Sequence, residues 1–383
     1  MNRTPALLVL DDGACFEGCA CGARGEASGE VVFTTSMTGY QETLSDPSYC
    51  GQIVTFTTAH IGNYGVTPLD RQGDRLFAGG AVCRDLFMSA AGSFPHWRAE
   101  ESLDRSLAAA GLTVISGVDT RALTLHLRDN GARNGIISAL DLDRESLTRR
   151  ARELPPMHGR DLTGLVTCAE PYLYEDGPIP DADRPVFRAA VYDFGVKRAI
   201  LNSLRAVGIE PAVWPAATPA ETVLASEPDG VVLSNGPGDP GACGYAIAAV
   251  KALLGRVPLF GICLGQQILG LALGATTYKL KFGHHGANQP VKELESGRVL
   301  VTSQNHGFCV DPDSLPRRAR ITHWNLNDDT LEGFACDDLA AFAVQFHPEA
   351  APGPNDAAPL FSRFRELMAA RAQQSACAAR RER

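Results

Sequence analysis

From about residue 187 onward, short apolar runs alternate with stretches in which apolar residues recur at helical spacing. The runs predict buried strands and the stretches predict helices. The predicted strands are residues 189–192, 211–214, 230–233, 257–260 and 341–346. The predicted helices are residues 196–207, a short helix opened by the capping box Thr218-Pro-Ala-Glu221, residues 245–254, residues 264–273, and a last helix from a cap at Asp356 to about residue 370. This alternation predicts an α/β domain over residues 188–372 with a mostly parallel, doubly wound sheet, whose ligands bind beyond the carboxyl ends of the strands.

The amino-terminal part of the chain has a different pattern, with many short β-like runs and few helices. The predicted strands are residues 7–10, 31–35, 52–57 and 135–139, and the predicted helices are residues 100–110 and 120–130. Asp12-Gly13 is a hairpin signal. We therefore expect a smaller α+β domain over residues 1–150, a proline-rich and acidic linker over residues 151–187, and a disordered basic tail over residues 373–383.

Cys263 stands between two glycines in Gly261-Ile-Cys263-Leu-Gly265, where a predicted strand gives way to a predicted helix. This position matches the sharp strand-to-helix turn of a nucleophile elbow, with sulfur in place of a hydroxyl. The glycines allow the turn and let a substrate approach the backbone. The positive end of the helix favours the thiolate, which is the nucleophilic form. A lone Cys is more often a buried structural residue, so the prediction needs a second group.

That second group is the segment His347-Pro-Glu349, which follows the predicted strand 341–346. Residues two apart in an extended chain point to the same side, so Glu349 is placed to orient the imidazole of His347. His347 and Cys263 lie 84 residues apart in the sequence, so only the fold can bring them together. The combination predicts a Cys–His–carboxylate triad for nucleophilic catalysis.

Composition narrows the class of protein. A chain of 383 residues favours two domains, and its formal net charge of −9 argues against a nucleic-acid partner, because phosphate binding needs a basic face. Eleven Cys without a disulfide pattern, and no signal peptide at the start, predict a reduced cytoplasmic protein. No apolar run approaches the ~20 residues of a membrane span. Cys15, Cys19 and Cys21 lack metal-ligand spacing and a nearby His, so we expect no metal site.

The loop Gly236-Pro-Gly238-Asp-Pro-Gly241 follows a predicted strand and fits the spacing of a dinucleotide-binding loop. Three features count against that interpretation: two prolines remove backbone N–H groups, the Asp adds negative charge, and no Asp or Glu lies near position 260 to hold a ribose. We favour an oxyanion hole. In it the N–H of Leu264, together with that of Gly236 or Gly238, would stabilise the negative oxygen of a tetrahedral intermediate.

The segments Gly261-Ile-Cys263-Leu-Gly265-Gln-Gln267 and His347-Pro-Glu349 together resemble the class I glutamine amidotransferase domain, whose members use the Cys to release ammonia from glutamine. Further segments resemble the small, glutamine-hydrolysing subunit of carbamoyl-phosphate synthetases, and the resemblance runs from about residue 7 to about residue 367. These segments are Thr35-Ser-Met-Thr-Gly-Tyr-Gln-Glu-Thr43, Asp46-Pro-Ser-Tyr49, Asp193-Phe-Gly195, Ser234-Asn-Gly-Pro-Gly-Asp-Pro240, Lys281-Phe-Gly-His-His-Gly286 and Gln304-Asn-His-Gly-Phe308.

The resemblance implies that Cys263, His347 and Glu349 are catalytic. It also implies a set of residues that bind glutamine: Ser48, Gly236, Gly238, Leu264, Gln267, Asn305, Gly307 and Phe308. Gln267 suits this role independently, because it lies on the same helix face as Cys263. Residues 305–308 are expected to form a polar loop after a strand at 298–302. Ser48 lies in the amino-terminal domain, so the pocket is expected to straddle the domains, although without the resemblance Ser48 reads as a turn residue.

Other residues near these segments are open to more than one interpretation. Lys197 is either an interface charge or a surface lysine at the start of a helix. His284 and His285 fit a structural turn between two glycines better than they fit ligands or bases. Gln266 departs from the His that many relatives of this subunit carry, and we expect the difference to affect local hydrogen bonding more than the chemistry.

By the same resemblance, the ammonia passes to a large synthetase subunit that makes carbamoyl phosphate for arginine and pyrimidine synthesis. We expect no cofactor on this chain, which lacks a Gly-x-x-x-x-Gly-Lys-Ser/Thr loop, and we expect ATP, Mg and bicarbonate on the large partner. Two alternatives remain: the amidotransferase subunit of anthranilate or guanylate synthesis, and a non-enzymatic binding module. Residues 35–43 and 46–49 count against the first, and the presence of Cys263 and His347 counts against the second.

Overall fold

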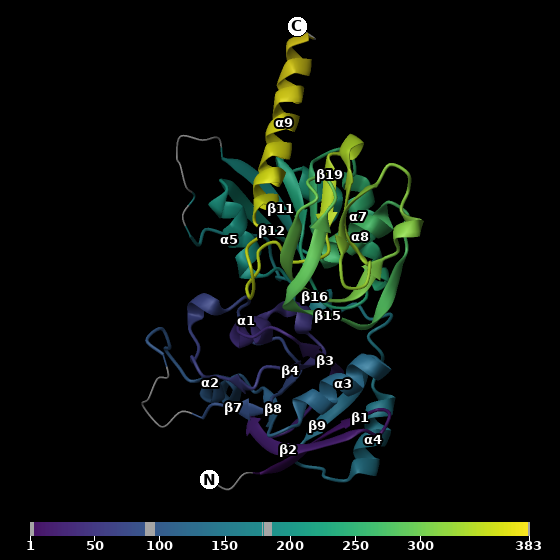
Figure 1. Ribbon diagram of the computed structural model, residues 1–383. Helices are drawn as coiled ribbons and strands as arrows, with labels where there is room; N and C mark the ends of the chain where they lie inside the picture. The colour runs from purple at the N-terminus through teal and green to yellow at the C-terminus, as the bar shows by residue number, and fades with distance from the viewer. Residues whose placement is uncertain (1–3, 89–95, 178, 180–185, 382–383) are drawn as a thin grey trace. The chain divides into compact units, whose positions relative to one another are not determined.

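The computed structural model describes residues 4–88, 96–177, 179 and 186–381, with side chains described up to residue 374 (Figure 1). The chain forms two compact units. The amino-terminal unit holds the described residues up to Arg160 together with Leu280–Ala287 and Ala351–Gly353. The carboxyl-terminal unit holds Asp161–Lys279, Asn288–Ala350 and the residues from Pro354 onward. Two short later segments therefore belong to the first unit, which the sequence pattern did not indicate.

The amino-terminal unit is built around a closed barrel of mixed strands. Their order around the barrel is β1 (Pro5–Leu10), β2 (Cys15–Gly22), β8 (Thr113–Ser116), β6 (Gly80–Val82), β4 (Gln52–Phe56), β3 (Glu26–Thr34) and β9 (Arg133–Ser138). The predicted hairpin at Asp12-Gly13 joins β1 to antiparallel β2, and Gly13 adopts φ 89° there. Closure leaves no free sheet edge, which the pattern of strands alone did not predict.

Helices and short elements surround this barrel. They are α1 (Tyr40–Ser45), η1 (Pro47–Tyr49), β5 (His60–Ile61), η2 (Pro68–Asp70), β7 (Asp85–Leu86), α2 (Leu103–Ala109), α3 (Thr120–Asn130) and α4 (Arg144–Glu153). Helix α3 has the predicted bounds, and its cap Asp119 accepts a hydrogen bond from the N–H of Ala122. Its Leu123 and Leu127 are buried in one cluster with strand residues such as Leu8. An apolar stripe on α3 thus anchors the helix to the barrel.

The carboxyl-terminal unit contains one mixed sheet. Its order is β10 (Tyr172–Leu173), β12 (Ile209–Pro215), β11 (Phe187–Asp193), β13 (Gly230–Leu233), β14 (Leu259–Ile262), β19 (Ala341–Val344), β18 (Leu331–Cys336), β17 (Arg320–Asn325), β15 (Thr277–Glu293) and β16 (Val299–Val310). The central strands from β12 to β19 are parallel, as predicted. Strands β18 and β17 extend the sheet in antiparallel fashion.

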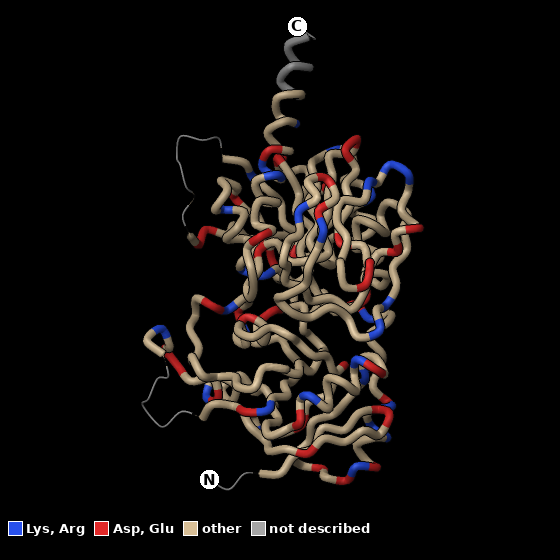
Figure 2. Tube along the Cα trace, viewed as in Figure 1, with Lys and Arg blue, Asp and Glu red and all other residues tan. Residues whose placement is uncertain are grey.

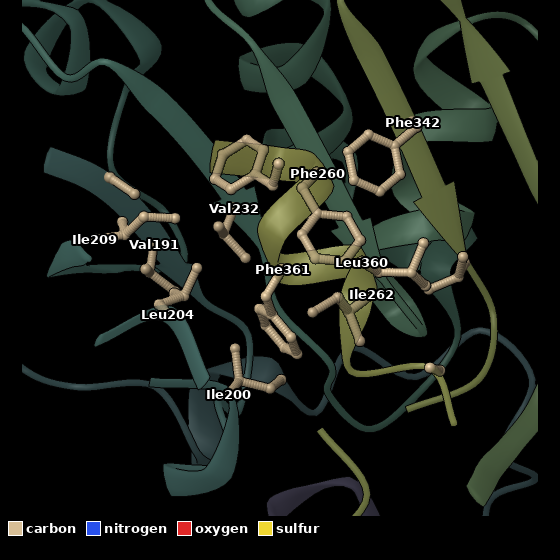
Figure 3. Close-up of a cluster of buried hydrophobic side chains, with 14 of the residues drawn as sticks. Val191, Ile200, Leu204, Ile209, Val232, Phe260, Ile262, Phe342, Leu360 and Phe361 are labelled. Atoms are coloured by element: carbon tan, nitrogen blue, oxygen red, sulfur yellow. The ribbon is translucent and has the colours of Figure 1, made fainter. Parts of the chain in front are cut away.

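The helices and short turns of this unit are η3 (Thr163–Leu165), α5 (Arg198–Ala206), α6 (Ala220–Leu224), η4 (Pro240–Ala242), α7 (Gly244–Leu253), α8 (Leu264–Ala272), η5 (Pro312–Ser314), η6 (Asp337–Leu339) and α9 (Pro359–Arg381). Helices α5 and α9 bury their apolar side chains in one cluster with the parallel strands (Figure 3). Phe260 of β14 lies at 4.5 Å from Phe342 of β19 and 5.8 Å from Phe361 of α9, between ring centroids. Helix α8 instead packs on β14 and on α7.

Three expectations about the linker and the caps are wrong. Residues 161–177 are part of the carboxyl-terminal unit, where β10 pairs with β12, rather than a solvated connection. Residues 178 and 180–185 of the expected linker lie outside the described residues. Thr218 does not cap α6, whose N-cap is Pro219. Asp356 does not cap the last helix, because its carboxylate accepts a hydrogen bond from the N–H of Val301 at 2.9 Å.

The expected disorder of the tail is also wrong as far as the structure describes it. Helix α9 starts at Pro359, a residue suited to a first helical position, and continues to Arg381. The Ala, Gln and Arg residues of the tail have high helix propensity, which outweighs the lack of an apolar pattern. Residues 382–383 lie outside the described part.

Charged residues of both signs are interspersed along both units (Figure 2). Among the described residues, the structure has no helix that combines the length and the apolar character needed to cross a membrane. The expectation that the chain binds no nucleic acid stays a prediction.

Candidate active site

Cys263 lies at the junction of β14 and α8 with a strained backbone, at φ 54° and ψ −107°. A non-glycine residue with positive φ is uncommon and marks a functional turn. The flanking glycines are required by packing. A Cβ at Gly265 would lie 2.0 Å from the carbonyl oxygen of Leu233, and one at Gly261 would lie 2.8 Å from that of Gly265. The geometry is that of a nucleophile elbow, as predicted.

Cys263 is buried and faces the neighbouring strands. Its N–H donates to the carbonyl of Val344 at 2.9 Å, which continues the parallel pairing of β14 with β19. Its thiol is 3.5 Å from the carbonyl oxygen of Asn305 on β16. The nucleophile predicted from the sequence is therefore held at the carboxyl edge of the parallel sheet, beside the end of the strand that leads to His347.

His347 and Glu349 form a buried pair just after β19. Nδ1 of His347 is 2.6 Å from Oε1 of Glu349, and the N–H of His347 donates to the carbonyl of Ser303 at 2.8 Å. Burial is the largest single influence on the pKa of His347 and lowers it, as does Lys197, but the attraction to Glu349 and the hydrogen bonds with Cys263 and Glu349 together raise it by more. The pKa of His347 thus lies above its ordinary value, so the ring stays protonated to a higher pH than a free imidazole.

The side chain of His347 is held for proton transfer. Its Nε2 is buried and makes no hydrogen bond of ordinary geometry with a described residue. The thiol of Cys263 donates to Asn305 instead. Catalytic hydrogen bonds are often loose in a structure without substrate and tighten in the complex. The arrangement leaves Nε2 as the ring atom available to exchange a proton.

The interpretation of Lys197 as a surface lysine is wrong, because its side chain is buried in the site. Its interpretation as an interface charge stays a prediction. Its Nζ lies 2.9 Å from Oε1 of Glu349 and donates to the carbonyl of Ala350 at 2.6 Å. Burial raises the pKa of Glu349, but Lys197 and His347 lower it by more, so the carboxyl stays ionised. Lys197, His347 and Glu349 thus form a buried charged cluster of three side chains. In the sequence, the signal near Lys197 was the segment Asp193-Phe-Gly195, which follows a predicted strand.

The expected oxyanion donors come together in the same unit. The N–H of Leu264, the first residue of α8, donates no hydrogen bond to a described residue. Gly236 lies beside it, since a Cβ on Gly236 would come within 2.8 Å of the Leu264 side chain and 2.2 Å of the Phe194 carbonyl. Gly238 adopts φ 92°, which favours glycine. Gly236 thus lies beside the residue that follows the nucleophile, and the oxyanion hole itself stays a prediction.

Residues 305–308 do not form the expected loop, because β16 extends through them to Val310. The polar residues there resemble a loop in sequence, but they lie in a strand, where the buried ring of His306 contacts the carbonyl of Phe308 at 2.8 Å and Oε1 of Gln304 at 3.1 Å. Gln267 of α8 donates to the carbonyl of Phe308 at 2.8 Å, and Asn305 contacts Cys263 through its carbonyl. Gly307 has only the tip of Lys279 near its Cβ position. Cys263, Leu264, Gln267 and residues 305–308 therefore lie together.

Ser48 lies in the amino-terminal unit, buried within η1, where its N–H donates to the carboxylate of Asp46 at 2.9 Å. Its role in binding glutamine stays a prediction. His284 and His285 do not form a turn. They are buried residues inside β15, with Gly283 at φ 73° and Gly286 at φ 155°.

Gln266 is fully buried on α8, and neither Oε1 nor Nε2 has a hydrogen-bond partner among the described residues. How Gln266, in place of His, affects the site stays a prediction. The unpaired amide of Gln266 lowers the stability of the folded chain, and Gln266 is not one of the triad residues.

Family models match both halves of the chain. Residues 8–137 match "Carbamoyl-phosphate synthase small chain, CPSase domain", and residues 190–367 match "Glutamine amidotransferase class-I". Among the relatives, the carbamoyl phosphate synthase small chain of Syntrophotalea carbinolica is 53% identical over 371 residues, covering 95% of this chain and 97% of the relative. That of Pseudomonas aeruginosa is 50% identical over 379 residues, covering 96% and 99%.

Solved structures match about half of the chain or less. A glutamine amidotransferase from Thermotoga maritima is 23% identical with a TM-score of 0.36, covering 43% of this chain and 77% of that protein. The near-complete coverage of close relatives is the stronger finding. This chain belongs to the carbamoyl phosphate synthase small chain family, and its carboxyl-terminal unit carries a class I glutamine amidotransferase domain.

Proposed function

We propose that this chain is the glutaminase subunit of a carbamoyl phosphate synthase and that Cys263 is its nucleophile. The observation that carries the proposal is the position of Cys263 at a strained strand-to-helix turn, beside the strand whose end places His347 against Glu349. Family membership supports glutamine as the substrate. The charged cluster supports acid–base chemistry, because Lys197 and Glu349 fix and electrostatically bias the imidazole.

In the first half-reaction, the Cys263 thiolate attacks the side-chain carbonyl carbon of glutamine and a carbon–sulfur bond forms. The carbonyl oxygen takes up the negative charge and is stabilised by the N–H of Leu264 and by the Gly236 loop. When the intermediate collapses, the carbon–nitrogen bond breaks and the His347 imidazolium gives its proton to the departing nitrogen. The products are ammonia and a γ-glutamyl thioester on Cys263.

In the second half-reaction, water attacks the thioester while His347 accepts a proton from it. The carbon–sulfur bond breaks, the sulfur leaves as thiolate, and glutamate is released. His347 ends the cycle protonated, which its raised pKa favours.

Ammonia made in this way passes to a large synthetase subunit, where carbamoyl phosphate is formed for arginine and pyrimidine synthesis. ATP, Mg and bicarbonate are used on that partner and no cofactor is held here, since the one glycine-rich loop beside the site carries two prolines and an Asp. We place the reaction in the cytoplasm, which suits a chain with many free thiols.

The test is release of ammonia from glutamine by the full chain, alone and with its large subunit. Cys263→Ser is compared with Cys336→Ser, a buried cysteine at the end of β18 outside the site. We expect activity to disappear in the first variant and to persist in the second. Persistence in Cys263→Ser, or no ammonia from the wild type with its large subunit, would contradict the proposal.

A further inference from the structure

The amide of Gln267 has a fixed orientation. Its Nε2 donates to the carbonyl oxygen of Phe308 at 2.8 Å and to Oε1 of Gln345 at 3.0 Å. An amide nitrogen carries two N–H groups, so both donors are used. A backbone carbonyl can only accept, and the Phe308 contact therefore identifies which end of the Gln267 amide is nitrogen.

The remaining polar atom of Gln267 is its carbonyl oxygen. Oε1 makes no hydrogen bond with any residue that the structure describes. Gln267 follows Cys263 by four residues on α8, which places both on one face of the helix. What Gln267 presents to a ligand beside Cys263 is thus a hydrogen-bond acceptor.

Gln345 is the second acceptor that holds the amide of Gln267 in this orientation. It follows β19 directly, two residues before His347, and its backbone N–H donates to the carbonyl of Glu332 at 2.8 Å. Its side chain is fully buried, and Nε2 has no partner among the described residues. Leaving a buried donor unpaired costs free energy. The group is therefore poorly explained by stability alone, whereas its Oε1 performs a defined task on Gln267.

Rotating the Gln267 amide by half a turn would set its oxygen against two acceptors, Phe308 O and Gln345 Oε1, and would lose both hydrogen bonds. With Gln345 replaced by an apolar residue, one of these restraints disappears. The amide would then be held in this orientation by the Phe308 carbonyl alone, and less firmly.

We propose that Gln345 is a positioning residue that determines specificity, because it holds the Gln267 oxygen toward the substrate and makes the pocket select a ligand that donates N–H. Glutamine has two such donors, the side-chain amide and the α-ammonium group. Glutamate keeps only the ammonium. This inference rests on the glutaminase function proposed above and adds a residue that does not itself touch the substrate.

The experiment uses the complex of the full chain with its large subunit. It measures kcat and KM for glutamine and the inhibition constant of glutamate. For Gln345→Met we expect KM to rise about three- to tenfold, the range for one hydrogen bond, with kcat within about twofold of wild type. An inhibition constant that rises in parallel assigns the Gln267 oxygen to the ammonium group. An unchanged one assigns it to the amide.

A double-mutant cycle separates this role from a general loss of packing. Because Gln345 acts through Gln267, its substitution should add little to the KM of Gln267→Met. Additive effects, or an unchanged KM in Gln345→Met, would overturn the inference. If Gln345→Met does not fold, Gln345→Glu retains an acceptor and should keep a KM near wild type, and a raised KM there would overturn it. An inactive wild type would instead contradict the proposed function.

Discussion

Lys197→Met tests whether the buried cation holds the catalytic carboxylate in place. Lys197 and Glu349 have side chains that are 2% and 0% exposed, and their charged atoms are 2.9 Å apart. Methionine keeps most of the volume of the stem and removes the charge. The variant leaves Glu349 facing His347 alone, and it also leaves the carbonyl of Ala350 without the Nζ donor.

The expected loss of stability follows from this geometry. At 2.9 Å the attraction between the two charges is about 6 kcal/mol for an effective dielectric of about 20. Removing one partner of a buried pair costs roughly 3–5 kcal/mol, because the other charge stays buried. His347 remains beside Glu349, so we expect the lower end, about 3 kcal/mol in the free energy of unfolding.

The assay is urea unfolding of the full chain at neutral pH, compared with Lys251→Met as the matched control. Lys251 is an exposed lysine on α7, and its substitution should change stability by no more than about 0.5 kcal/mol. If Lys197→Met lost less than about 1 kcal/mol, the argument that a buried ion pair holds Glu349 would be refuted.

The pH dependence gives a second readout. The folded state lowers the pKa of Glu349 below its ordinary value of 4.5, so the associated stability is present above that pH and is lost as pH falls toward the folded pKa. Without Lys197 the folded pKa rises and this contribution shrinks. The stability difference between wild type and Lys197→Met should therefore be full at neutral pH and decrease below about pH 4.5. A difference that grew on acidification would contradict this sign.

Three further predictions concern neighbouring residues. Gln266→Met should raise the free energy of unfolding by about 1 kcal/mol in urea, because both amide atoms are buried and unpaired; a loss would contradict this. Gly265→Ala should abolish soluble folded protein, since its Cβ would meet a backbone oxygen at 2.0 Å, whereas Gly244→Ala, in open space, should express normally. Glu349→Gln should move the upper pH limit of kcat/KM downward, because the carboxylate is what raises the pKa of His347, and an unmoved limit would refute this.

Much of the active site was predictable because its signals are local. The glycines around Cys263 mark a turn where a side chain would clash with the backbone. Glu349 does contact His347 as expected, but through a turn in which the N–H of Ala350 donates to the carbonyl of His347 at 3.1 Å, not through the extended segment that the sequence suggested. The parallel strands that bring these segments together were predicted from short apolar runs. In each case the catalytic side chain and the residues that shape its backbone are a few positions apart in the sequence.

Lys197 and Gln345 show what a single sequence leaves out. The Nζ of Lys197 reaches a carbonyl that is 153 residues away, and no periodicity marks a lysine at a helix start as buried. Gln345 lies in an apolar run of the sequence, and its hydrogen-bond partner Gln267 comes from α8, 78 residues away. Such buried polar pairs depend on tertiary packing, which a single sequence does not show. The same holds for residues 305–308, which look like a polar loop in sequence but are part of β16.

The most direct test of the account is to identify the atom that attacks glutamine. The full chain, with its large subunit, is treated with a glutamine analogue that carries a diazoketone in place of the side-chain amide, and the labelled peptide is sequenced by mass spectrometry. We expect stoichiometric alkylation of Cys263, prevented by excess glutamine and parallel to the loss of ammonia release. Inactivation with the label on another residue, or full activity after Cys263 is alkylated, would contradict it.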